Sequence, residues 1–341
     1  MESTIGGAGL ATAAGVAIGL SFVPLKGMTR YRFEHWSSLS AVLALVLLPW
    51  TLAAQLCPDL LGALAQVPLS SYAKANACSF AWGIANVLCG LCLVRIGVSL
   101  TMGVLTGVGL PIGILLPMVL KGSGAFAAAP PLASPTGLAL AVLTAVLVFS
   151  VVMMAQAGLE RERAQPAAAP GAGAFSAGLA MAVACGFLQT GLSFAFVYSQ
   201  GPLMEALRAR GAGESGAIAA VWAATLPGGA LVNIGFPLSR AIARKTLRGY
   251  LSLGDFLRTA AMAALFVTCL LCMGNGMRLM GALGASLGFG LYQVFQTLSS
   301  QAVGALSGEW RDAGRRARVR MAGAVLLMLA AVMALAFLKV T

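Results

Sequence analysis

The chain is dominated by apolar stretches close to 20 residues long, separated by short segments rich in glycine, proline and charge. About 20 helical residues, rising 1.5 Å each, cross the roughly 30 Å hydrocarbon core of a bilayer. Hydrophobic residues make up 59% of the sequence and charged residues only 9%, which leaves too little polar surface for a water-soluble domain. The sequence therefore predicts an all-α, polytopic membrane protein.

Hydrophobic runs and the glycine, proline and charge between them predict ten transmembrane helices. The expected spans are 4–24, 36–56, 73–94, 98–119, 136–158, 175–198, 216–238, 256–276, 279–303 and 319–339. The composition of "ERERAQPAAAPGAGAF", after the fifth span, indicates a linker. We expect a first repeat at 1–160, a linker at 161–174 and a second repeat at 175–341. Residues 201–213 are expected to hold a short surface helix.

Three short motifs recur in the same order in the two parts of the chain. "GLATA" and "GLSF", which begin at Gly9 and Gly19, return as "GLAMA" and "GLSF", and "GVSLTMG" at 97–103 returns as "GASLGFG" at 284–290. This order indicates the duplication of one five-helix unit. Because five is odd, the second copy has to enter the membrane upside down. The sequence thus predicts two inverted repeats, an arrangement that places the substrate site of many transporters near the bilayer midplane.

The distribution of basic residues predicts the orientation of the chain. Of the 22 Lys and Arg, 16 fall on one side of the predicted spans. The other side holds only Lys74, Lys121, Arg208, Arg210, Arg278 and Lys339. The richer side is expected to be cytoplasmic, which places both termini outside, in the periplasm. The net charge of +12 is thus attributed to topology and contact with anionic lipid, and no nucleic-acid partner is expected.

Large polar side chains near the middle of the spans are the clearest functional signal, because an amide buried in hydrocarbon without a partner costs several kcal/mol. The candidate substrate-binding residues are Trp82, Asn86, Gln189, Ser193, Tyr292, Gln293, Gln296, Asn233, Ser21 and Thr106. A group of amides, hydroxyls and two aromatic rings would suit a neutral polyol or sugar. The alternative role for each is interhelical hydrogen bonding, worth about 0.6 kcal/mol per pair.

Titratable groups are scarce within the predicted spans. No carboxylate lies near a span centre, so Glu34 and His35, at the start of the second span, are the candidates for coupling to protons. Their alternative role is to anchor the membrane interface together with Trp36. The seven cysteines lie mostly within spans, where a thiol behaves as a small hydrophobe. We expect neither a metal site nor a cofactor.

Five short motifs carry a resemblance to known transporters. They are "FVPLK" at 22–26, "LLPW" at Leu47–Trp50, "WGIAN" at Trp82–Asn86, "NIGF" at Asn233–Phe236 and "GEWRDAGRR" at 308–316. In this order they cover nearly the whole chain. The chain resembles the drug/metabolite transporter superfamily and, within it, the bacterial L-rhamnose–proton symporter family.

The resemblance implies a ten-helix fold in a bacterial inner membrane and proton-driven uptake of a deoxyhexose. By position, Trp82, Asn86 and Glu34 match the pattern of that family. The ninth span departs from it, because "GFGLYQVFQTLSSQ" at 288–301 stands where the rhamnose symporters have charged and aromatic groups.

The function we expect is secondary transport of a small neutral solute, most plausibly an L-rhamnose-like sugar, by proton symport with alternating access. Its partners are that solute, protons and the lipid bilayer, and the sequence carries no indication of an oligomeric state. One alternative is an exporter of amino acids or other small metabolites, and another is a membrane component that transports nothing. An intramembrane enzyme is disfavoured, because the spans contain no paired aspartates, no Ser–His pair and no cluster of metal ligands.

Overall fold

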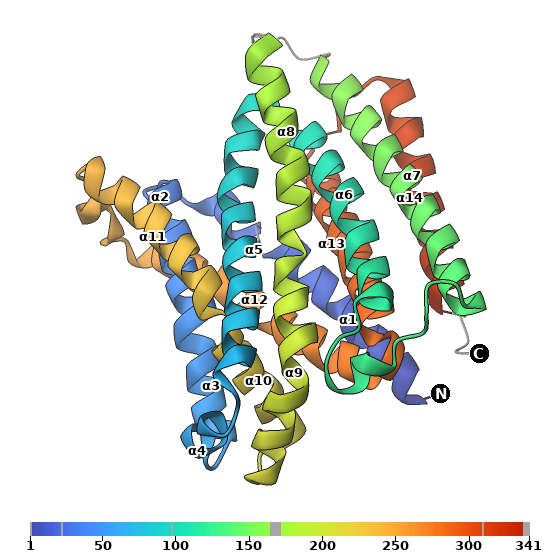
Figure 1. Ribbon diagram of the computed structural model, residues 1–341. Coiled ribbons are helices and arrows are strands. Elements are labelled where there is room, and N and C mark those ends of the chain that lie inside the picture. Colours follow the sequence, from blue (N-terminus) through green and yellow to red (C-terminus); the bar gives the residue numbers. More distant parts are fainter. Residues whose placement is uncertain (1, 22, 97, 164–171, 309, 337–341) are drawn as a thin grey trace.

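The computed structural model describes residues 2–21, 23–96, 98–163, 172–308 and 310–336, and within them every regular element is helical. Figure 1 shows the helices packed as one bundle. The longer helices are α1 (Glu2–Leu20), α2 (Phe33–Ala41), α3 (Leu48–Leu56), α5 (Leu69–Ile96), α6 (Val98–Val119), α7 (Pro135–Arg163), α8 (Ala172–Gln189), α9 (Gly191–Ala209), α10 (Glu214–Thr225), α11 (Pro227–Ala243), α12 (Leu253–Leu279), α13 (Phe289–Leu306) and α14 (Arg315–Ala336). The short ones are η1 (Val23–Gly27), η2 (Val42–Leu47), α4 (Leu60–Ala65), η3 (Gly124–Ala128), η4 (Leu247–Tyr250), η5 (Gly281–Leu283) and η6 (Gly284–Gly288).

Eight helical segments of the described chain are long and apolar enough to cross a membrane, and the bent pair of α10 and α11 would make a ninth. This establishes a multi-pass membrane protein. The tenth expected span, 279–303, corresponds to η5, η6 and α13, where three glutamines and several hydroxyls lower the hydropathy. Ten spans therefore remain a prediction.

Two expected boundaries differ from the structure. The surface helix expected at 201–213 is wrong, because α9 continues through Pro202 to Ala209 as part of the long segment Phe175–Ala209. It continues because Leu203, Met204 and Leu207 bury one face of the added turns. Of the expected linker 161–174, residues 161–163 belong to α7 and 172–174 to α8, and 164–171 lie outside the described residues.

The helices of the two expected repeats pack in matching pairs. The first helix of the first half, α1, lies along α12 and α13 of the second half. The first helix of the second half, α8, lies along α5 and α6 of the first half. Similarly, α5 contacts α11, and α12 contacts the continuous segment of α2, η2 and α3. Figure 1 shows α1 starting at the lower end of the bundle and α8 starting at the upper end. These two helices therefore begin at opposite ends of the bundle.

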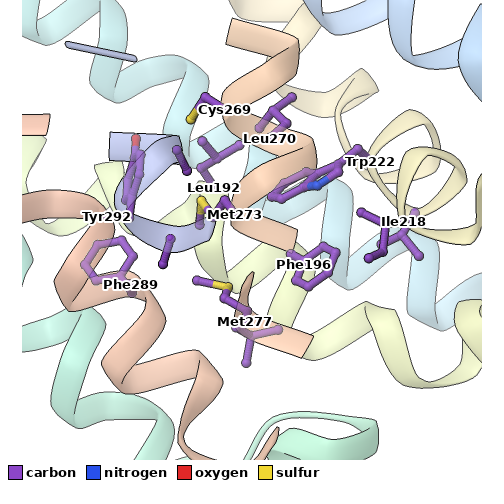
Figure 2. Close-up of a cluster of buried hydrophobic side chains, with 14 of the residues drawn as sticks. Leu192, Phe196, Ile218, Trp222, Cys269, Leu270, Met273, Met277, Phe289 and Tyr292 are labelled. Atoms are coloured by element: carbon purple, nitrogen blue, oxygen red, sulfur yellow. The ribbon is translucent and has the colours of Figure 1, made fainter. Parts of the chain in front are cut away.

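A buried apolar core forms where α9, α10, α12 and α13 meet (Figure 2). Phe196 stacks on Trp222 with their ring centroids 4.8 Å apart. Gly274 allows this close approach, because a Cβ there would lie 2.9 Å from Trp222 Nε1 and 2.7 Å from Ile218 Cγ2. This core joins four helices of the second half into one body.

Candidate functional site

The main irregularity in the described part of the bundle is the break between α10 and α11, which are bent by 52° where the sequence "LPGG" at 226–229 begins. Pro227 has no N–H to continue the helical hydrogen-bond ladder, so backbone groups around it need other partners. The two glycines that follow let α11 approach α5 closely. A Cβ at Gly229 would lie 2.8 Å from Ser79 Oγ.

Two side chains of α5 supply the missing partners. Asn76 donates from Nδ2 to the carbonyl of Ala224 at 3.1 Å and accepts at Oδ1 from the N–H of Gly228 at 2.8 Å. One turn later, Ser79 donates to the carbonyl of Leu226 at 3.3 Å and accepts from the N–H of Gly229 at 2.9 Å. The break is thus held by side chains from the other half of the chain.

A cavity of about 560 Å³ lies beside this break. It is lined by Val46, Trp50 and Asn76 from the first half and by Pro227, Gly228, Ala230, Leu231, Ile234 and Gly235 from the second. Its size falls within the roughly 300–1,000 Å³ of pockets that bind small molecules. The wall is mainly apolar, with the Trp50 indole as its one aromatic group and Asn76 as its one amide.

Three of the predicted site residues come together next to this cavity. Asn86 of α5 donates to Asn233 Oδ1 of α11 at 3.0 Å, and Asn233 donates to the carbonyl of Gly229 at 2.9 Å. Trp82 is buried one turn before Asn86 and stacks on Phe266 of α12 with centroids 6.0 Å apart. Its ring also faces Gly229, where a Cβ would lie 2.9 Å from Trp82 Cε3. Both halves of the chain contribute to this cluster.

Four other predicted residues lie elsewhere in the bundle. Gln189 is half-buried and donates to the carbonyl of Leu105 at 2.8 Å, which links α8 to α6. Thr106, the next residue of α6, is buried. Ser21 is buried and donates to the carbonyl of Ile18 at 2.7 Å. The buried hydroxyl of Ser193 has no hydrogen-bond partner among the described residues.

The three candidates of α13 differ from one another in their surroundings. Tyr292 lies in the apolar core, 6.1 Å from the ring of Phe289 (Figure 2). Gln293 is buried and Gln296 is half-buried. No hydrogen bond joins either of these amides to another described side chain or backbone group. These two amides are therefore available to a ligand or to water.

Glu34 and His35 are buried at the start of α2 and join it to the connection between α11 and α12. His35 Nδ1 accepts from the N–H of Arg32 at 3.1 Å, while Nε2 lies 2.8 Å from the carbonyl of Thr246. A carbonyl only accepts, so Nε2 donates this hydrogen bond. Glu34 lies 3.7 Å from Arg244 and accepts from the Thr246 hydroxyl at 3.3 Å.

The same connections are tied together by groups that the sequence alone did not single out. Asp255, at the start of α12, is buried and accepts from the N–H groups of Arg30 at 2.7 Å and Tyr31 at 2.9 Å. The Tyr31 hydroxyl donates to the carbonyl of Tyr250 at 2.8 Å. Burial, followed by the nearby Asp255 and Tyr250, raises the pKa of Tyr31, so its phenol keeps the proton that it donates.

Sequence reasoning missed Asn76, Ser79, Trp50 and Asp255 as members of the site. The motif "LPGG" in the middle of a predicted span was the available signal, since glycine and proline within an apolar span are typical of a discontinuous helix. Asn76 and Ser79 share one face of α5 with Gly83, which packs against Val232 of α11. No group of metal ligands occurs among the described residues.

Residues 7–338 match the model of the L-rhamnose-proton symport protein family. The chain belongs to this family. The L-rhamnose-proton symporter of Mannheimia succiniciproducens is 26% identical to it over 326 residues, which is 91% of each chain. Those of Salmonella paratyphi B and Salmonella typhimurium are each 27% identical over 320 residues, again 91% of each chain. The resemblance drawn from the five motifs is confirmed.

Membership of this family makes the chain a transporter and not an enzyme. The family description and the three relatives give no support to the alternative of an exporter of amino acids or other metabolites.

Proposed function

We propose that this protein takes up L-rhamnose, or a closely similar deoxyhexose, together with protons across a bacterial inner membrane. The family match and the names of the relatives support this substrate and this coupling ion. The observation that carries the proposal is the broken helix held by α5, because it borders a cavity that is lined by both halves of the chain. Transporters commonly build their substrate sites from discontinuous helices at the interface of two repeats.

The mechanism that we infer is alternating access between two inverted five-helix repeats, 1–160 and 175–341. The matching helix pairs support it, since α1 meets α12 and α13 in the way that α8 meets α5 and α6. One close approach of a glycine to a backbone carbonyl matches as well. A Cβ at Gly15 would lie 2.5 Å from the carbonyl oxygen of Tyr292, and one at Gly186 would lie 3.0 Å from that of Leu105. The separation of Leu105 and Tyr292 along the chain equals that of the motifs "GVSLTMG" at 97–103 and "GASLGFG" at 284–290.

The substrate would lie in the cavity beside the break, within reach of the Asn86–Asn233 pair. The indole of Trp50 offers an apolar face for the C–H groups and the methyl group of a deoxyhexose. Asn86 is exposed, so a sugar hydroxyl could exchange with its bond to Asn233. Asn76 has both amide hydrogens engaged, because it also donates to the carbonyl of Tyr72 at 3.0 Å. Its role is therefore to hold the break rather than to bind the sugar.

The proton would be carried by the His35–Glu34 pair. Protonation of His35 at Nδ1 replaces an acceptor with a donor that faces the N–H of Arg32, so this contact has to break. That contact lies in the first turn of α2, beside the bond from His35 Nε2 to the carbonyl of Thr246 in the α11–α12 connection. Binding of a proton would thus rearrange the start of α2 at the place where it meets the other half. The excess of basic residues there supports a cytoplasmic location, with both termini in the periplasm.

Uptake of radiolabelled L-rhamnose into proteoliposomes tests the proposal. We expect accumulation when an inward proton gradient is imposed, and only equilibration when the gradient is collapsed by an ionophore. L-Fucose and L-alanine serve as competitors of different chemistry. Absence of counterflow with L-rhamnose and with every other monosaccharide tested would refute the sugar assignment. Counterflow without any response to the gradient would refute the coupling to protons.

A further inference from the structure

Two lysines stand out on the side of the bundle that has few basic residues. The structure describes five of the six basic residues assigned to that side, and its three arginines all pair with carboxylates. Arg208 lies 2.8 Å from Glu214, Arg278 lies 3.4 Å from the same carboxylate, and Arg210 pairs with Asp59. Neither of the other two, Lys74 and Lys121, pairs with a carboxylate among the described residues.

Both of these lysines line one cavity of about 400 Å³, which is separate from the cavity beside the helix break. Its remaining lining residues are Cys78, Gly122, Ser123 and Tyr198. Lys74 comes from α5, Lys121 follows the end of α6, and Tyr198 comes from α9. No acidic residue is part of the lining, so two positive charges face the same space without a counter-charge.

The wall of this cavity is fixed by its own hydrogen bonds. Tyr198 donates to the carbonyl of Leu120 at 2.8 Å, and Ser123 donates to that of Val197 at 3.0 Å. Lys121 uses one of its three N–H groups on the carbonyl of Ala129. Lys74 has no hydrogen bond to any described residue. The two ammonium groups therefore keep five N–H donors for a ligand, and a tetrahedral oxyanion could accept from both of them.

We propose that this cavity binds the phosphate group of an anionic ligand. Lys74 lies five residues, about 7.5 Å, inside the start of α5, and Lys121 lies just beyond the end of α6. Both helices are long and apolar enough to cross a membrane, so we expect these two ends near the lipid headgroups. A phospholipid headgroup and a free phosphate share this chemistry. A phosphate bound here would connect α5 and α6 of the first half to α9 of the second.

Thermal unfolding of the purified full-length protein in detergent tests this site. The ligands are phosphatidylglycerol, phosphatidylcholine as the zwitterionic reference, and inorganic phosphate against chloride at equal ionic strength. The variant is Lys74→Gln/Lys121→Gln, and Lys74→Arg/Lys121→Arg keeps both charges. The matched control is Lys245→Gln, which removes an exposed lysine from another connection.

We expect phosphatidylglycerol to raise the unfolding temperature of the wild type above the value in phosphatidylcholine. At least half of that shift should be lost in the double glutamine variant and kept in the arginine variant and in Lys245→Gln. If inorganic phosphate alone gives the shift, and the glutamine variant loses it, the ligand is a free phosphate and the site stands. An equal shift in the wild type and the glutamine variant would overturn the proposal. If that variant does not fold, Lys74→Gln alone carries the same test, because its side chain is exposed and makes no hydrogen bond to a described residue.

Discussion

Asn76 Oδ1 on α5 accepts a hydrogen bond from the backbone N–H of Gly228 at 2.8 Å, immediately after the proline that breaks the seventh predicted span. The two residues belong to different halves of the chain. The geometry of the broken helix therefore depends on a side chain from the opposite half. Any rearrangement of one half against the other has either to keep this hydrogen bond or to break it. Transport should therefore be sensitive to substitution of Asn76.

Asn76→Ala should destabilise the protein by about 1–3 kcal/mol, because it leaves the carbonyl of Ala224 and the N–H of Gly228 without their partners. Rhamnose uptake should fall together with stability. Thermal unfolding and initial uptake rates measure the two effects. The matched control is Asn275→Ala, since among the described residues the Asn275 amide bonds only to the carbonyl of Leu271 in its own helix. Equal effects of the two substitutions would show that the break does not need Asn76.

Asn86→Leu and Asn233→Leu should separate a binding role from a structural one. If their bond only joins helices, a double-mutant cycle should give a coupling energy of about 0.6 kcal/mol, and each leucine should be tolerated in lipid. If the pair binds the sugar, each variant should also lose the stabilisation that L-rhamnose gives to the wild type. Thermal unfolding with and without L-rhamnose measures both quantities. Full retention of the ligand shift in both variants would exclude the pair from the site, and Gln293→Leu extends the same test to α13.

Trp50→Ala should raise the KM for L-rhamnose while the protein still folds, because the indole is a half-buried wall of the cavity. Trp50→Phe should recover part of the affinity, since a smaller ring still offers an apolar face. Trp36→Ala is the control, because Trp36 is also half-buried but packs on Phe33 outside the cavity. If Trp36→Ala raises the KM as much as Trp50→Ala does, the cavity is not the sugar site.

The sequence predicted what depends on composition and local periodicity, and missed what depends on distant partners. The apolar runs were enough to predict a helical membrane protein, and the spacing of Trp82 and Asn86 placed them correctly one turn apart on one helix. The contact of Asn86 with Asn233 is known from the structure alone. The role of Asn76 was not predictable in this way. Its importance comes from backbone groups about 150 residues later, which lack helical partners only because Pro227 interrupts that helix.

Asp255 shows the same limit at the end of a helix. From the sequence it was one of several acidic residues in connecting segments, yet it is buried and binds three consecutive backbone N–H groups of residues 29–31. The sequence gives no sign that this loop folds against the start of α12. Glu34 and His35 were found because the chain has a single histidine, which draws attention by composition alone.

His35→Gln should uncouple transport from the proton gradient. The glutamine amide can still donate to the carbonyl of Thr246, so the connection stays closed, but the side chain no longer takes up a proton. We expect rhamnose counterflow to continue while accumulation driven by the gradient is lost. Both assays use the same proteoliposomes, which removes differences in protein amount. Tyr31→Phe is the comparison, because it removes the bond to Tyr250 in the same cluster without removing a titrating ring. Gradient-driven accumulation that survives in His35→Gln would assign the proton to another group.

The proposed inverted relationship of the halves predicts that equivalent glycines respond alike. Gly15→Ala would place its Cβ 2.5 Å from the carbonyl oxygen of Tyr292, and Gly186→Ala would place its Cβ 2.7 Å from Val108 Cβ. Each should cost about 1–3 kcal/mol by forcing the helices apart. Gly90→Ala is the control, because nothing lies within 4 Å of its Cβ position, and higher helix propensity should make it neutral or stabilising. A large loss in only one half would mean that the two interfaces are not equivalent, and the inverted repeat would lose its main structural support.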